Sequence, residues 1–199
     1  MNLNFLPYSM FADGVVSDDD ADKLENYLDE DISKIEYKSI DSNMHNFFTS
    51  SPNHNLSDDS IEWEKYKDVF MPYVSDFIFK LTDNVKSLEL MIYLNLCRKD
   101  SFIAPHYDGG TLKTYFMMLY CPKKYENKYP YTSYLTCDKY YHTFNKFEKL
   151  PCKDNCINFY HERGKFYIVP ANLLHWVSQI NDNIDRTTIM CSIDPEFKE

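Results

Sequence analysis

The stretch SLELMIYLNLC, from Ser87 to Cys97, alternates apolar side chains with polar or mixed ones. Leucines and an isoleucine occupy positions 88, 90, 92, 94 and 96, whereas Tyr93 and Asn95 belong to the other set. A period of two predicts a β-strand with one face packed in a core. We therefore expect helices to pack on the leucine face, with Tyr93 and Asn95 turned towards a more polar interior.

Strand-like runs continue towards the C-terminus from this stretch. They read TYFMMLY, YTSYLTC, KFYIVPA, HWVSQI and RTTIMCSI. Residues 121–163 read as a Tyr- and Lys-rich insertion between strands. The strand region of residues 87–194 thus predicts a sandwich or a barrel.

The pattern before Ser87 is helical, so we expect residues 1–86 to be mainly helical support. The segment SDDDADKLENYL begins with Ser17 and acidic residues, which suit a helix N-terminus. Between Tyr66 and Leu81 the apolar residues recur at steps of one, three and four, which predicts a long helix with a kink at Pro72. Residues 40–58 are polar and are predicted to form a loop. Helices followed by short strands indicate the α+β class.

Composition indicates a single folded domain over residues 1–199. Hydrophobic residues make up 44% of the chain and charged residues 26%, which is typical of folded soluble proteins. We find neither an apolar run long enough to span a membrane nor a signal-like opening, so we expect a cytoplasmic protein without membrane contact. The excess of Tyr, Lys and Asn over Gly and Ala is typical of AT-rich genomes, including viral ones.

The charge distribution argues against a protein built to coat nucleic acid. The net charge is −10, whereas phosphate contacts need a positive face. Residues 121–165 hold nine Lys or Arg against five acids, which is +4 and leaves −14 for the remainder. A solvated loop or an anionic-substrate patch both explain this segment.

Six cysteines in a chain without an export signal are expected to stay reduced. Cys152 and Cys156 suggest either free thiols or a zinc site completed by His161 and one of two further cysteines, Cys121 or Cys137.

A pair of metal-ligand residues follows the first strand, in the segment FIAPHYDGGTLKTYF. In an extended backbone His106 and Asp108 project to the same side, so both can bind one metal ion. An imidazole and a carboxylate suit a borderline divalent ion such as Fe(II), Mn(II), Co(II) or Zn(II). Gly109 and Gly110 would let the backbone turn beside the ligands.

The C-terminal strands offer a third ligand and a buried cation. His175 follows a β-rich run and a Pro-Ala-Asn turn, and Arg186 follows eleven positions later, with Thr188 two beyond it on the same face. An arginine at an inward strand position is costly unless an anion neutralises it. Arg186 therefore predicts a buried carboxylate partner.

Taken together, His106-Tyr107-Asp108, His175 and Arg186-Thr187-Thr188 resemble the pattern of the Fe(II)- and 2-oxoglutarate-dependent dioxygenases over residues 87–194. The resemblance implies a double-stranded β-helix, a jelly-roll or cupin-like fold, with the N-terminal helices packed on one sheet. It also implies three cofactors or cosubstrates, Fe(II), 2-oxoglutarate and O2.

The resemblance assigns roles to these residues. His106, Asp108 and His175 would be both the metal ligands and the catalytic centre, leaving positions open for cosubstrate and oxygen. Arg186 would bind the distal carboxylate of 2-oxoglutarate, helped by Thr188. Further contacts are expected from Asn95, Tyr93 and Tyr115. Cys97 stands where related enzymes often have a tyrosine, and Tyr93 or Tyr115 would replace it.

The expected reaction is hydroxylation of a protein side chain or a small metabolite, with release of succinate and CO2. Ser192 stands where DNA-repair dealkylases usually carry a second arginine, and Arg186 stands where prolyl hydroxylases usually carry a lysine. Two alternatives remain: a nucleic-acid-modifying oxygenase that grips phosphates with the 121–163 insertion, and a non-catalytic cupin-like metal-binding or sensing domain. The sequence leaves the oligomeric state open.

Overall fold

The computed structural model describes residues 1–6, 9–34, 38–39, 44–49, 61–106, 114–125, 132–135, 156–177 and 185–198. Two helices and eleven strands lie within these ranges. Asp108, its two following glycines, and most of residues 126–155 lie outside them. Neither helix has the combination of length and apolarity that a membrane crossing requires.

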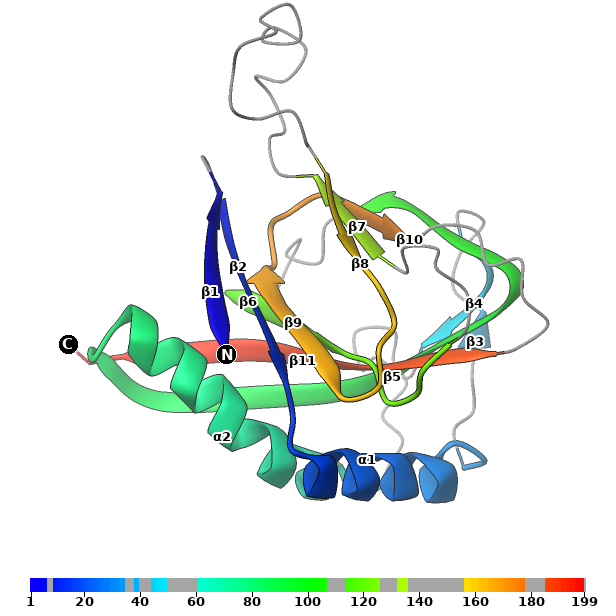
Figure 1. The fold of residues 1–199 in the computed structure, drawn as a ribbon, viewed down its shortest axis with the longest axis horizontal. Helices are drawn as coiled ribbons and strands as arrows, with labels where there is room; N and C mark the ends of the chain where they lie inside the picture. The colour runs from blue at the N-terminus through cyan, green and yellow to red at the C-terminus, as the bar shows by residue number, and fades with distance from the viewer. Residues whose placement is uncertain are drawn as a thin grey trace, which may run out of the picture.

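One long strand organises the fold by passing through two layers. β5 (Val85–His106) pairs along its first half with β11 (Arg186–Phe197), and near its end with β10 (His175–Val177). Figure 1 shows β5 running along the lower layer and curving up into the upper one. The residue at this bend with a positive φ is Asp100, at 63°.

The strand order is that of a double-stranded β-helix, as the sequence resemblance predicted. The lower layer continues from β11 to β6 (Phe116–Tyr120), β9 (Lys165–Pro170) and β2 (Ser9–Val15), with β1 (Asn2–Leu6) at its edge. The upper layer continues from β10 to β7 (Thr132–Leu135) and β8 (Cys156–Phe159). All strand pairings within the described residues are antiparallel.

Alternation along β5 and β11 sorts side chains into two cores, as expected from the period of two. Leu90, Ile92 and Leu94 join the cluster that packs under the helices, together with Ile189 and Cys191. The alternate residues face the space between the two layers, where an apolar cluster forms from Tyr93, Cys97, Ile103, Met117, Leu119, Phe159, Tyr167, Val169, Ala171, Val177 and Met190.

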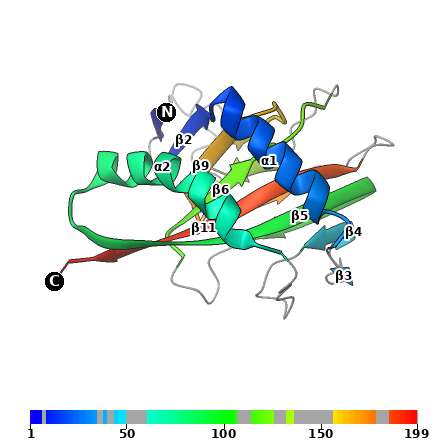
Figure 2. The same cartoon turned by 90° about the horizontal axis from the view of Figure 1, so that it is seen from below.

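Both predicted helices are present and cover the outer face of the lower layer (Figures 1 and 2). α1 (Asp18–Asp31) begins where Ser17 Oγ accepts a hydrogen bond from the Asp20 N–H at 3.2 Å, as its capping sequence predicts. α2 (Trp63–Leu81) continues through Pro72 as one element. The Tyr73 hydroxyl joins the two helices by donating to the Asp20 carboxylate at 2.7 Å and accepting from the Ser17 N–H at 2.9 Å.

The N-terminal half contains more strand than the sequence predicted. The predicted loop of residues 40–58 contains β4 (Met44–Thr49), which pairs with β5 and with the short β3 (Lys38–Ser39). The β1–β2 hairpin was not predicted either. These segments are short and lack clean alternation, so pairing with a neighbouring strand, and not the local pattern, determines their conformation.

The segment that the sequence reads as an insertion, residues 121–163, contains two strands, and the strand-like run YTSYLTC predicted the first of them. β7 and β8 lie within it and form the edge of the upper layer, where Thr132 pairs with Phe159. Residues 126–131 and 136–155 of this segment lie outside the described part of the chain.

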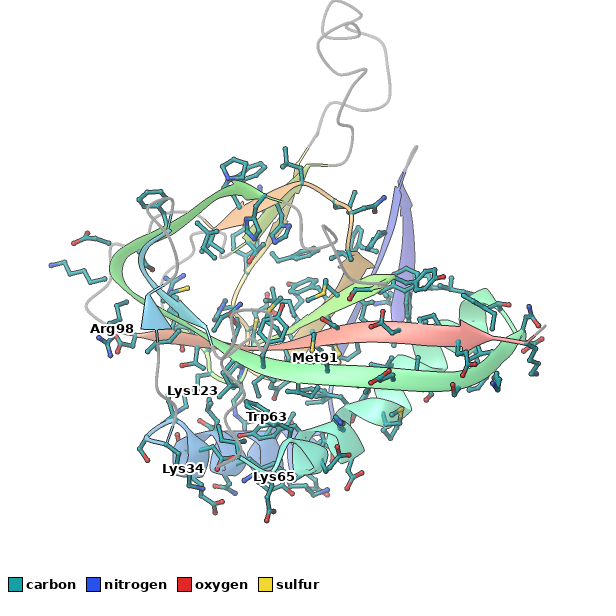
Figure 3. The ribbon with its side chains drawn as sticks, turned by 180° about the vertical axis from the view of Figure 1, so that it is seen from behind. Lys34, Trp63, Lys65, Met91, Arg98 and Lys123 are labelled. Atoms are coloured by element: carbon teal, nitrogen blue, oxygen red, sulfur yellow. The ribbon has the colours of Figure 1, made fainter. Side chains whose placement is uncertain are left out.

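A buried carboxylate locks α1 to α2. Asp31 is fully buried, and its oxygens accept hydrogen bonds from Lys34 at 2.7 Å and Tyr66 at 3.0 Å, with Lys65 Nζ at 2.7 Å. Figure 3 shows Lys34 and Lys65 projecting from the ends of the two helices near each other. Burial alone would raise the pKa of Asp31, but hydrogen bonds from Lys34, Lys65 and Tyr66 outweigh it and leave the pKa below its usual value.

Replacing Asp31 by asparagine is expected to lower the free energy of unfolding by about 2 kcal/mol at neutral pH, because the buried carboxylate that pairs with Lys34 and Lys65 loses its charge. A lowered pKa contributes stability that is present above the unfolded-state pKa and is lost as pH falls through the folded-state pKa. Urea unfolding should therefore separate the variant from wild type at pH 7 and bring the two together in acid. Asp76→Asn, which removes an exposed pair with Lys80, is the control. Equal stability of the two variants at pH 7 would refute this account.

Candidate functional site

Two of the predicted metal ligands meet at one end of the barrel. His106 is the last residue of β5 and His175 the first of β10, and their Cα atoms are register partners. The imidazole centroids lie 4.2 Å apart. Metal–nitrogen bonds of about 2.1 Å allow two rings at this separation to share one ion.

The orientation of His175 is consistent with metal binding. Its ring is 4% exposed, and Nδ1 lies 3.1 Å from the Leu173 carbonyl oxygen. A hydrogen bond from Nδ1–H to this carbonyl leaves Nε2 with its lone pair for a ligand. The Leu173 carbonyl itself is positioned by the turn after β9, where the Leu173 N–H donates to the Pro170 carbonyl at 3.2 Å.

The third predicted ligand, Asp108, lies outside the described residues, two positions beyond the end of β5. Within the described ranges, no group of three His, Cys, Asp or Glu side chains is placed to hold a metal. Of the three predicted ligands, the described residues include His106 and His175 and bring these two together.

The candidate ligands of the predicted zinc site also lie partly inside and partly outside the described residues. Cys121 is a buried free thiol, and burial raises its pKa to about 12. Cys137 and Cys152 lie outside the described residues, so the zinc alternative stays a prediction.

Arg186 lies inside the barrel, as its inward strand position predicts. It is the first residue of β11, is 2% exposed, and pairs in register with Cys97. By contrast, Arg98 points to the edge of the molecule (Figure 3), is half exposed, and lies 3.6 Å from the Asp185 carboxylate. Arg98 and Arg186 thus lie on opposite faces of the paired strands β5 and β11, and Arg186 is the one that faces the interior.

Thr188 and Asn95 form the next interior pair. Thr188 is fully buried and opposes Asn95 across the β5–β11 ladder. The Asn95 Oδ1 atom is buried and has no hydrogen-bond partner among the described residues. The oxygen and nitrogen of an amide are assigned from their surroundings, and a half-turn of this one would offer an N–H donor to an anion beside Arg186.

The two predicted tyrosine contacts are placed differently. Tyr93 faces the interior, is 8% exposed, and pairs with Met190, about 13 Å along the strand from the Arg186 row. Tyr115 is 51% exposed and contacts the Phe197 ring at 5.6 Å, and its N–H donates to the Ile193 carbonyl. The structure does not bring Tyr115 to Arg186, because the strand that follows it pairs with the far half of β11.

Two residues that the sequence did not assign to the cosubstrate site lie near Arg186: Tyr125, and His161, which was considered only as a zinc ligand. The Arg186 guanidinium carbon is 5.4 Å from the centre of the Tyr125 ring, and the Tyr125 ring is 4.9 Å from that of His161. The Tyr125 hydroxyl accepts a hydrogen bond from the Thr187 N–H at 3.0 Å. Tyr125 follows β6, which pairs with β11, so this pairing was the signal that could have located it.

Burial keeps both of these groups uncharged. Burial raises the pKa of Tyr125, so its hydroxyl keeps its proton and can donate it while accepting from Thr187. Burial, together with the Arg186 charge, holds the pKa of His161 well below its usual value. The Arg186 side chain thus lies near two rings that carry no charge.

Replacing Tyr125 by phenylalanine is expected to lower the melting temperature by about 3 °C, because the Thr187 N–H loses its acceptor. Thermal unfolding followed by circular dichroism measures this shift. Tyr115→Phe, at a half-exposed position, is the matched control. A shift no larger than that of the control would show that the hydrogen bond does not stabilise the start of β11.

Comparison with solved structures identifies the class of fold. The chain is similar to a prolyl-4-hydroxylase from Pseudomonas putida, with 8% identity, a TM-score of 0.65, and coverage of 94% of this chain and 92% of that one. It is also similar to a Trichoplax adhaerens prolyl hydroxylase in complex with a hypoxia inducible factor peptide fragment, with 8% identity, a TM-score of 0.61, and coverage of 92% and 83%. No protein-family model and no curated protein matches the sequence.

A third similar structure is HygX from Streptomyces hygroscopicus with nickel and 2-oxoglutarate bound, with 12% identity, a TM-score of 0.57, and coverage of 96% and 84%. The fold of this chain is therefore the double-stranded β-helix of the Fe(II)- and 2-oxoglutarate-dependent oxygenases. This confirms the fold that the sequence resemblance predicted.

Proposed function

We propose that this chain is an Fe(II)- and 2-oxoglutarate-dependent oxygenase that hydroxylates a protein side chain or a small molecule. The observation that carries the proposal is the meeting of His106 and His175 at one end of a barrel whose interior also contains Arg186. A metal-binding domain without turnover would need the histidines but not a buried guanidinium. The fold of the similar oxygenases supports the same reading.

The donor chemistry fits the proposed metal. Two imidazoles and one carboxylate form the facial triad typical of non-haem Fe(II) oxygenases. We propose that Asp108 supplies the carboxylate beside His106 and His175. The Leu173 carbonyl would hold the His175 ring in the tautomer that binds metal through Nε2.

The interior of the lower layer fits a dicarboxylate. Arg186 offers a planar pair of N–H donors to a carboxylate, and Thr188 lies on the same face two residues on. Tyr125 and Asn95 would add neutral hydrogen bonds. Because these groups are buried, their interaction with an anion is less screened than on the surface.

When bound, the iron and cosubstrate supply the oxidising chemistry: 2-oxoglutarate is converted to succinate and CO2, and one oxygen atom of O2 enters the substrate. The residues of this chain position the partners and exclude water. The apolar cluster around Ile103 and Val177 lines the wall next to the histidines, which favours oxidation of the substrate over reaction with solvent.

Two solved structures with this fold indicate which substrate classes to consider. One is described with a peptide fragment bound and the other with hygromycin B. We propose a peptide or a small molecule for this chain on the same basis. A nucleic-acid substrate is disfavoured by the net charge of −10.

The test is formation of succinate from 2-oxoglutarate by protein loaded with Fe(II) under anaerobic conditions and then exposed to O2. We expect slow succinate formation alone and faster formation with the correct member of a peptide, nucleotide and metabolite library. The proposal requires that succinate formation depend on both Fe(II) and O2. A protein that binds metal but neither binds nor consumes 2-oxoglutarate would favour the cupin-like alternative.

A further inference from the structure

A buried threonine on the upper layer lies in the row next to the histidines. Thr132 on β7 pairs with Val177 on β10 and with Phe159 on β8, and Val177 pairs in turn with Ile103 on β5. Ile103, Val177 and Phe159 all belong to the cluster that fills the interior. Register partners share a face of the sheet, so the Thr132 side chain also faces the interior.

This row lies between the metal end and the arginine end of the barrel. Along β5, His106 pairs with His175, Ile103 belongs to the Thr132 row, and Cys97 pairs with Arg186. The step from the histidine row to the Thr132 row is two residues of β10, or about 7 Å. A dicarboxylate bound at the metal by one end and at Arg186 by the other would have to pass this row.

Within the described part of the chain, no contact gives the Thr132 hydroxyl a structural role. Thr132 is 2% exposed, and its Oγ1 atom has no hydrogen-bond partner among the described residues. Its register partners Val177 and Phe159 are apolar, and valine would fill the same volume without burying a hydroxyl. A buried hydroxyl without a partner destabilises the protein that carries it, which calls for a functional explanation.

A second such atom lies on the opposite layer. Asn95 Oδ1 is also buried without a partner among the described residues, and Asn95 pairs with Thr188 one step from the Arg186 row. Among the described residues, buried polar atoms without a hydrogen-bond partner thus occur on both layers that enclose the interior. Such an arrangement fits a polar occupant that the two layers hold between them.

We propose that Thr132 is a further residue of the 2-oxoglutarate site, and that its hydroxyl donates a hydrogen bond to the bound dicarboxylate from the upper layer. The inference rests on the proposed function. It extends the cosubstrate site from β5 and β11 to β7. Thr132 is a binding residue in this account, and it takes no part in metal coordination.

The test compares Thr132→Val with Thr187→Val, a threonine that is also buried but lies on the alternate face of β11. Protein loaded with Mn(II) under anaerobic conditions is titrated with 2-oxoglutarate by calorimetry. We expect Thr132→Val to raise the Kd about tenfold, because a hydrogen bond to a charged group is lost. We expect Thr187→Val to leave the Kd within about twofold of wild type.

Two further measurements separate binding from folding. Without ligand, Thr132→Val should melt at the wild-type temperature or above it, because it removes an unsatisfied hydroxyl. Thr132→Ser, which keeps the hydroxyl, should bind 2-oxoglutarate within about threefold of wild type. Mn(II) affinity should be the same in all variants.

The outcomes distinguish the inference from the proposed function. Equal Kd values for Thr132→Val and Thr187→Val would overturn the role of Thr132. If the wild-type protein binds 2-oxoglutarate in that case, the proposed function stays intact. If Thr132→Val fails to fold, Thr132→Ala is measured against Thr187→Ala with the same criterion. Wild-type protein that loads Mn(II) but does not bind 2-oxoglutarate would overturn both.

Discussion

His175→Ala is expected to lower the affinity for Fe(II) or Mn(II) by at least about a hundredfold, and His106→Ala to do the same. Each substitution removes one nitrogen from a donor set in which the two imidazole centroids lie 4.2 Å apart. Because the cosubstrate binds through the metal, 2-oxoglutarate binding should fall with it. Equilibrium dialysis with metal analysis measures the bound metal directly.

His54→Ala provides the control, because the sequence spacing of His54 does not match a ligand. It should retain one metal ion per chain. Full metal binding by His175→Ala would show that the histidine pair is a packing contact inside the barrel and would leave the oxygenase proposal without its centre.

Arg186→Met should weaken 2-oxoglutarate binding about a hundredfold while leaving metal affinity unchanged. The guanidinium is 2% exposed, so a bound carboxylate would interact with it away from solvent. Methionine keeps much of the side-chain volume and removes the charge. Calorimetric titration of the Mn(II)-loaded variant measures the loss.

Arg186→Lys refines this prediction, because it retains a positive charge but loses the planar fork. We expect a loss of about tenfold, between wild type and Arg186→Met. Arg163→Met is the control, since Arg163 pairs with Asp22 and Glu25 on the surface. If Arg186→Met loses metal as completely as His175→Ala, the division of roles between the metal and carboxylate sites is wrong.

The features that the sequence predicted well depend on local periodicity and on motif spacing. The alternation in β5 and β11 survives in the structure because each strand is packed on both faces, by the helix-side core and by the barrel interior. Arg186 is buried on the face that alternation assigned to it. His106 and His175, 69 positions apart in sequence, lie together because their strands are register partners.

Features that depend on contacts between distant segments were missed. β4 lacks a clear pattern of its own and acquires its conformation by pairing with β5. β8 is a short edge strand in a segment that reads as an insertion. Short strands of this kind carry too few residues for periodicity to exceed chance.

The surroundings of Arg186 were only partly predictable for the same reason. Asn95 and Thr188 follow from strand alternation, because they are cross-strand partners on the interior face. Tyr125, His161 and Thr132 come from segments between strands or from β7, and only the barrel brings them inside. Tyr115 was predicted as one of two tyrosines that could replace the one missing at Cys97, whereas its neighbours in the sheet leave it half exposed.

The central claim is that one metal ion and one 2-oxoglutarate bind together inside this barrel. Titration of 2-oxoglutarate into wild-type protein, with and without Mn(II) and in the absence of O2, tests it most directly. We predict one 2-oxoglutarate per chain in the presence of Mn(II), and binding at least about tenfold weaker without it. Equal binding in both conditions, or none in either, would contradict the account.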